Sequence, residues 1–193
     1  KLRGARRIFM DYASATPVLP EVRKVMEKYW SRDFYNPAAI YEEGVRVKKE
    51  TEEYRTKIAR LLGVASESII FTSGGTEANT WAVRGVRSGR IVIGEDSHPS
   101  VREAVKSITG KETTLVSSIT TDNKLGRKIR EERKKNNSEY PLLHIDASQS
   151  ANYFNVGLET LACDLLTLDA AKLYGPKGVG ALIVKKGVKL NLP

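Results

Sequence analysis

The sequence has one cysteine and no long apolar run among its 193 residues, so it has little from which disulfide bonds or membrane-spanning helices could form. The single cysteine, Cys163, excludes an internal disulfide and fits a reducing compartment, so we expect a cytoplasmic protein. No apolar segment approaches the roughly 20 residues of a membrane-spanning helix, and the N-terminal residues lack the apolar core of a secretory signal. With only two histidines and no ligand spacing, we predict no metal site.

Charge is unbalanced, with 32 Lys and Arg against 23 Asp and Glu and a net charge of +9. The densest run, RKIREERKK at 127–135, mixes both signs at helical spacing and contains no aromatic residue on which a base could stack. We interpret it as the solvated face of a helix and expect neither a nucleic acid nor a membrane as partner. The rival interpretation, a basic nucleic-acid-binding module, requires an affinity that falls steeply with salt.

Helical and strand patterns alternate along the chain. Helices are predicted over 20–30, 41–62, 76–86, 99–108 and 125–135, and strands over 68–72, 90–94, 142–146, 164–168 and 179–184, while a strand at 113–116 is left open. Continuous apolar strands separated by helices indicate an α/β fold, a three-layer, mostly parallel sheet with helices on both faces. We expect one domain over residues 1–193, with its ligand beyond the carboxyl ends of the strands.

Two residues at predicted strand ends suggest a particular chemistry. Lys172 lies in a short loop after one apolar strand, just before the tight turn Gly175-Pro176-Lys177-Gly178. A lysine fixed in this way presents an amine for a Schiff base. Asp146 ends another apolar strand, where a carboxylate can meet a buried cationic ring nitrogen. Together the two residues point to pyridoxal 5'-phosphate (PLP) as cofactor.

Three further features lie at the same predicted edge. The loop SGGTEAN at 73–79 follows a strand and opens a helix, so the free N–H groups near Gly75 and Thr76 could seat a phosphate, although an ordinary turn with an N-cap explains it equally well. His98 precedes Pro99 in a loop, and Gln149 follows Asp146 by three residues. His144, inside an apolar strand, is expected to be a structural residue with its hydrogen bonds satisfied.

An ordered set of segments carries a family resemblance. DYASATPV (11–18), NPAA (36–39), IIFTSGGTEAN (69–79), DSHPSV (96–101), HIDASQS (144–150) and KLYGPKGVGAL (172–182) resemble, in this order, the PLP-dependent cysteine desulfurases of the class V aminotransferase group, fold type I. The resemblance implies a role for each candidate residue. Lys172 would be the Schiff-base lysine, Asp146 the partner of the pyridinium nitrogen, His98 the ring-stacking proton shuttle, Gln149 the donor to the ring hydroxyl, and Gly75 with Thr76 the phosphate ligands.

The same resemblance implies a reaction and partners. Enzymes of this family convert L-cysteine to L-alanine and pass the sulfur to an enzyme cysteine as a persulfide, for iron–sulfur cluster assembly or tRNA thiolation. They are usually dimers, and their small domain, substrate-binding arginine and persulfide cysteine belong to later segments. We therefore expect a PLP-binding large domain without the small C-terminal domain, incomplete by itself, which forms a homodimer or joins a complementing chain.

Several positions depart from the family pattern. The family has histidine just before the lysine and serine three before it, both serving the phosphate, whereas this sequence has Ala171 and Asp169. Losing two donors and adding a carboxylate should weaken phosphate binding by about 10²-fold or more. Tyr41 replaces a histidine after the NPAA motif. Cys163 does not match the catalytic-cysteine position and is expected to fill the core. These departures favour a rival function, a degenerate non-catalytic scaffold or partner-binding module.

The segment between 116 and 141 is shorter than in the family, which places a strand and an Asn-Asn-Glu-Ile-Gly loop there. One alignment maps that loop onto residues 122–126. The other takes SSITTDNK (117–124) as the end of the preceding helical segment, so that a central strand is missing. We favour the second alignment because SSITTDNK makes a poor buried strand, and it predicts a gap in the sheet that neighbouring strands must close.

Overall fold

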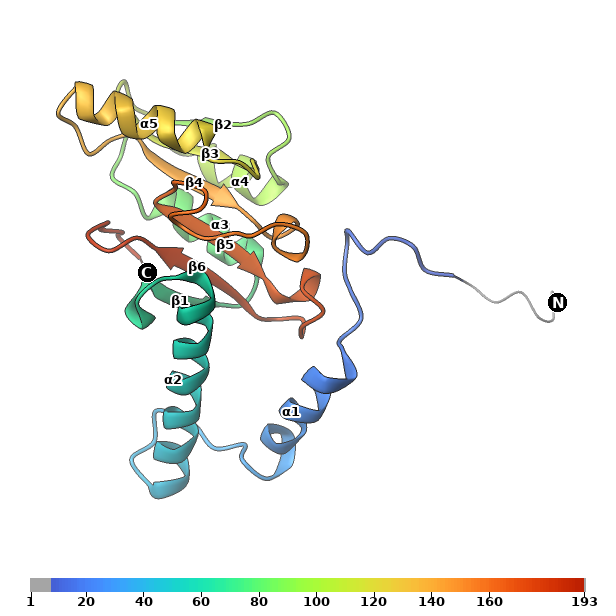
Figure 1. Cartoon of the computed structure of the whole chain (residues 1–193). Helices are drawn as coiled ribbons and strands as arrows, with labels where there is room; N and C mark the ends of the chain where they lie inside the picture. The colour runs from blue at the N-terminus through green and yellow to red at the C-terminus, as the bar shows by residue number, and fades with distance from the viewer. Residues whose placement is uncertain (1–7, 193) are drawn as a thin grey trace.

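The computed structural model describes residues 8–192, in which six strands form one mixed sheet in the order β1-β6-β5-β4-β3-β2 (Figure 1). The strands β2 to β5 pair in parallel, and β6 is antiparallel to both β5 and β1. Five strands therefore run in one direction, as predicted for a mostly parallel sheet. Their bounds are β1 (Ile69–Thr72), β2 (Arg90–Ile93), β3 (Thr113–Ser118), β4 (Leu142–Asp146), β5 (Leu165–Asp169) and β6 (Gly180–Val184).

Helices cover both faces of the sheet, because neighbouring strand residues point to opposite sides. Leu142, Leu165 and Leu182 pack with α3 and α4, whereas Leu143, Leu166 and Ile183 pack with α2 and α5. Every one of these positions is apolar, which explains the continuous apolar strands and confirms the three-layer prediction. The helices are α1 (Pro20–Ser31), α2 (Glu42–Leu62), α3 (Gly75–Arg84), α4 (Pro99–Val105) and α5 (Lys124–Lys135).

The preferred alignment takes residues 117–124 as the end of a helical segment, and this part of it is wrong. Residues 113–118 form β3, which lies inside the sheet and pairs in parallel with β2 on one side and β4 on the other. No gap separates the two strands it joins, and the loop 119–123 leads directly into α5. The polar Ser117 is buried at no cost in hydrogen bonding because its hydroxyl lies 2.8 Å from Nδ1 of His144. A strand followed by a loop agrees with the first alignment, but residues 124–126 of the segment that it assigns to the loop already belong to α5.

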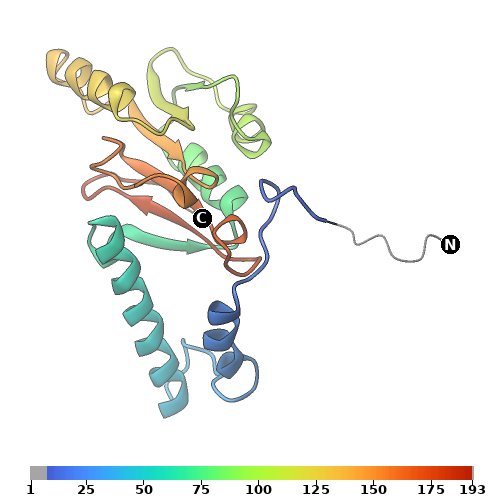
Figure 2. The ribbon, with the colours of Figure 1, turned by 45° about the vertical axis from the view of Figure 1, so that its right-hand side comes forward.

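The helix α1 and the first turns of α2 project away from the sheet (Figure 2). No residue of α1 is buried, and the apolar side chains of Trp30, Phe34, Ile40 and Val45 are more than half exposed. Among residues 8–192, no helix is long and apolar enough to cross a membrane. An apolar surface is thus left uncovered on this projecting part of the chain.

Candidate active site

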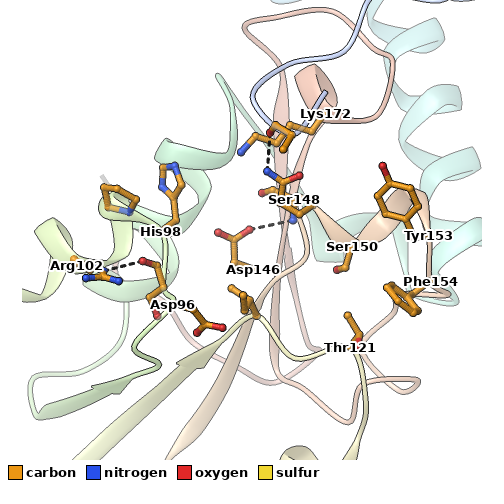
Figure 3. Close-up of a pocket in the computed structure, with 15 residues that line it drawn as sticks. Asp96, His98, Arg102, Thr121, Asp146, Ser148, Ser150, Tyr153, Phe154 and Lys172 are labelled. Atoms are coloured by element: carbon orange, nitrogen blue, oxygen red, sulfur yellow. Dashed lines mark hydrogen bonds between the residues drawn. The ribbon is translucent and has the colours of Figure 1, made fainter. Parts of the chain in front are cut away.

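A cavity of about 740 Å³ lies at the carboxyl ends of β4 and β5 (Figure 3). Four of the six predicted site residues line it: His98, Asp146, Gln149 and Lys172. The strand-end rule places them together, since they follow β2, β4 and β5, which run in the same direction. The remaining two predicted residues, Gly75 and Thr76, are not part of the cavity lining. Gly75 begins α3 next to Ser148, a residue of the lining, and the Thr76 side chain is exposed.

Asp146 is a buried carboxylate held in one orientation. Its Oδ2 accepts from Nδ2 of Asn79 at 2.8 Å, and its Oδ1 accepts from the backbone N–H of Ser148 at 3.0 Å. Burial alone would raise the pKa of this carboxyl, but hydrogen bonds from Ser148 and Asn79 are among the effects that outweigh burial and hold the pKa below its usual value. A buried, ionised carboxylate at the cavity wall is suited to a cationic ring nitrogen.

His144 lies directly behind this carboxylate and is a structural residue, as expected. Its ring bridges the neighbouring strands: Nδ1 is 2.8 Å from Oγ of Ser117, and Nε2 is 3.0 Å from Oγ1 of Thr167. Burial lowers its pKa from 6.5 to about 4, against the opposing effect of the Asp146 charge. The ring is therefore neutral near pH 7 and adds no positive charge to the site.

His98 is connected to Asp146 through two polar residues that sequence reasoning missed. Nδ1 of His98 accepts from the backbone N–H of Ser100 at 3.1 Å and lies 2.8 Å from the Ser100 hydroxyl. Asn79 donates through Nδ2 to both that hydroxyl, at 3.0 Å, and Asp146. Because Nδ1 is occupied, Nε2 is the ring nitrogen left for a ligand. Asn79 is almost fully buried on α3. The only sequence signal for its role was an asparagine within a predicted helix.

The backbone around Lys172 is fixed by a distant segment. Thr16 donates through its backbone N–H to the carbonyl of Ala171 at 2.9 Å, and its Oγ1 accepts from the N–H of Tyr174 at 2.8 Å. Nδ2 of Asn152 donates to the carbonyl of Lys172 itself. The residues on both sides of the lysine are therefore anchored. The sequence comparison included residues 11–18 but gave Thr16 no role.

Gln149 also contacts the N-terminal segment. Its Nε2 donates to the carbonyl of Ala13 at 2.7 Å, and Ala13 is part of the cavity lining. One of its two amide hydrogens is thus taken in this structure. The second hydrogen remains for the donor role that the family resemblance implies.

A carboxylate stands at the start of α3, beside the cavity, where a phosphate was predicted. Asp169 ends β5, and its Oδ1 accepts from the backbone N–H of Ala171 at 3.0 Å. Its Oδ2 lies 3.3 Å from the position that a Cβ would take on Gly75, at the start of α3. The residues present therefore fit the ring of PLP, which Asp146, Lys172 and His98 would hold, better than they fit its phosphate.

Cys163 is buried in the core, as expected. It packs with the face of the sheet that α2 and α5 cover, and burial raises the pKa of its thiol to about 12. The thiolate is the nucleophilic form of cysteine. This residue is therefore unsuited to accept sulfur as a persulfide.

Comparison with known proteins agrees with the sequence resemblance. The family model Aminotransferase class-V matches residues 8–140 and 94–193. The chain is 33% identical over 220 positions to cysteine desulfurase IscS of Dictyoglomus turgidum, covering 96% of this chain and 56% of that protein. It is 31% identical to cysteine desulfurase IscS of Methanosarcina thermophila, covering 96% and 54%. The chain thus spans just over half the length of these curated relatives.

Solved structures give the same result. A NifS-like protein superposes with a TM-score of 0.83 at 26% identity, covering 96% of this chain and 60% of that one. A structure described as SspA in complex with cysteine has a TM-score of 0.78 at 24% identity and supports the fold alone. The family model matches most of the chain, and the curated relatives are cysteine desulfurases. The chain therefore belongs to the aminotransferase class-V family, whose enzymes depend on PLP, and is similar to its cysteine desulfurases.

Proposed function

We propose that residues 1–193 are the cofactor-binding large domain of a cysteine desulfurase-like enzyme and hold the PLP ring beyond β4 and β5. The observation that carries this proposal is the convergence of Lys172, the ionised Asp146 and His98 on one cavity. PLP, when bound, supplies an electron sink that stabilises negative charge at the substrate α-carbon. The rest of the chemistry depends on how this chain holds its own side chains.

Each residue has a distinct proposed task. Asp146 would keep the ring nitrogen protonated, because its buried carboxylate is stabilised by Asn79 and the N–H of Ser148. Lys172 would present its amine from a turn anchored by Thr16 and Asn152. His98 would move a proton at Nε2, since Nδ1 is engaged by Ser100. Gln149 would donate to the ring hydroxyl, and the start of α3 at Gly75 and Thr76 would face the phosphate.

The substrate and partners belong to the same proposal. We propose L-cysteine as substrate, with sulfur passed to a cysteine outside this chain because Cys163 is buried and its pKa is raised to about 12. This chain would form a homodimer or associate with a complementing chain that carries the small domain. The exposed apolar side chains of Trp30, Phe34 and Ile40 support such an association. The one cysteine and its burial support a reducing, cytoplasmic setting.

A second candidate, a non-catalytic scaffold that no longer binds the cofactor, is favoured by one observation. The carboxylate of Asp169 stands at the start of α3, and Ala171 offers no side-chain donor beside it. The two candidates differ in whether Lys172 reacts with PLP.

The deciding experiment is an absorbance titration with PLP, followed by borohydride reduction and mass spectrometry of the adduct. We expect the wild-type adduct on Lys172, and we expect Lys172→Ala to lose it while keeping the wild-type melting temperature. Lys106→Ala is the matched control, because it removes an exposed lysine that only pairs with Glu103. Folded wild-type protein without an adduct would favour the scaffold instead, and an adduct that survives in Lys172→Ala would move the reactive amine elsewhere.

A further inference from the structure

The carboxylate of Asp169 is fixed against the start of α3 by the sheet itself. In the register of β6, Gly180 pairs with Asp169 on one side and with Thr72 on the other. A Cβ on Gly180 would stand 2.6 to 2.9 Å from backbone atoms of Gly74, so only glycine lets the turn before α3 come this close to the end of β5. The carboxylate and the helix start are therefore held together by strand pairing.

The orientation of the carboxylate is also fixed. Its Oδ1 accepts from the N–H of Ala171, which caps the short 3-10 turn Ala170–Lys172. The second oxygen, Oδ2, then faces Gly75 at 3.3 Å from its Cβ position. Among residues 8–192, no lysine or arginine forms a salt bridge with Asp169. A carboxylate without an ion-pair partner in this part of the chain thus stands at the start of α3, whose free N–H groups would otherwise attract an anion.

The other side chains around the start of α3 do not balance this carboxylate. Glu77, in the first turn of α3, accepts from the N–H of Ser73 and brings a second carboxylate to the same turn. Ser148 contributes a buried hydroxyl 3.0 Å from the Cβ position of Gly75, but the same side chain also helps to lower the pKa of Asp146. One neutral hydroxyl cannot balance a fixed carboxylate against a phosphate dianion, because like charges at such separations repel strongly in a partly buried site.

We infer that Asp169 removes the usual preference of this site for a phosphorylated ligand, so that the cavity binds the unphosphorylated B6 ring about as well as its phosphate ester. The inference rests on the proposed function, since it takes the B6 ring as the ligand. It adds that the affinity comes from the ring contacts of Asp146, His98 and Lys172. The phosphate contributes no net attraction, and Asp169 is the residue that determines this specificity.

The test compares pyridoxamine with pyridoxamine 5'-phosphate, which differ only in the phosphate and form no covalent bond with Lys172. Isothermal titration of the wild-type protein should give dissociation constants within roughly tenfold of each other. Asp169→Asn keeps the acceptor for the N–H of Ala171 and removes the charge. We expect it to tighten pyridoxamine 5'-phosphate by roughly 10- to 100-fold and to leave pyridoxamine unchanged.

Asp96→Asn is the matched control, because Asp96 is a second carboxylate that lines the cavity together with His98. It removes the same charge and should leave the ratio of the two dissociation constants unchanged. If Asp169→Asn does not fold, Asp169→Ser provides a second neutral variant. Equal effects of Asp169→Asn and Asp96→Asn would overturn the inference in favour of a general charge effect.

Other outcomes separate this inference from the proposed function. A wild-type protein that prefers the phosphate ester by more than about 100-fold overturns the inference, while PLP labelling of Lys172 leaves the proposed function standing. A protein that binds neither ligand in any variant, and is not labelled by PLP, overturns both. Wild-type affinities that are similar, with a phosphate-specific gain in Asp169→Asn, establish the role of Asp169.

Discussion

The buried imidazole of His144 should make the stability of this domain depend on pH in a range where most carboxyl groups do not titrate. Burial between β3 and β5 lowers its pKa in the folded protein from 6.5 to about 4. Between these two values the unfolded chain binds a proton that the folded protein does not. Acidification therefore stabilises the unfolded chain, and stability is lost as pH falls from 6.5 towards 4.

The size of the effect follows from the two pKa values. Lowering the pH from about 7.5 to about 5 should reduce the free energy of unfolding by about 2 kcal/mol through His144 alone. The carboxyl groups with lowered pKa, among them Asp146 and Glu159, lose their stabilising contribution mainly at lower pH and add little in this window. Two kcal/mol is a large share of the stability of a domain of this size.

The assay is urea unfolding, followed by circular dichroism, at a series of pH values from about 7.5 to about 5. His144→Asn keeps an amide near Ser117 but has no titratable ring, so it should lose this part of the pH dependence even if it is less stable throughout. The matched control is His98→Asn, which removes the exposed histidine and should retain the wild-type slope. Equal slopes for wild type and His144→Asn would refute the assignment of the effect to a neutral, buried His144.

Two further predictions concern the turn that carries Lys172. Ala171→His should add a donor at the phosphate end and lower the dissociation constant of PLP by roughly tenfold, whereas an unchanged constant would count against the phosphate lying beside Ala171. Thr16→Val removes the hydroxyl that bonds Tyr174 and Ala171, so we expect a loss of about 1–3 kcal/mol in urea unfolding and slower PLP labelling of Lys172. Thr16→Ser should restore both, and wild-type labelling in Thr16→Val would disprove the anchoring role.

The sheet and its helices could be predicted because their signal is local. Strands β4, β5 and β6 consist mostly of apolar residues, and helices cover both faces of each, so the apolar pattern agrees with the fold. The strand β3 was misjudged at its polar end for the opposite reason. Ser117 looks unsuitable for burial until its partner is known, and that partner, His144, is 27 residues away. The polarity of a residue in the sequence does not reveal which other buried polar group it will form a hydrogen bond with.

The site residues also differ in whether local sequence patterns could predict them. Lys172, Asp146 and His98 could be placed together because each follows a strand, and parallel strands bring such residues to one edge. Thr16 could not be assigned, since its contacts with Ala171 and Tyr174 join segments about 155 residues apart. Nothing in the local pattern of a threonine before a proline indicates that it anchors a lysine loop.

Asp169 shows why a substitution recognised in a sequence does not reveal its effect without the structure. From the sequence alone, the Asp169 side chain could equally have pointed away from the helix start, where its charge would not repel a bound anion. The structure gives it a local task, because its Oδ1 caps the turn that presents Lys172, and this cap directs Oδ2 towards Gly75. The geometry that holds the lysine turn is therefore the same geometry that repels a phosphate. An asparagine separates the two effects, since it keeps the cap and removes the charge, whereas an alanine would confound them by loosening the turn as well.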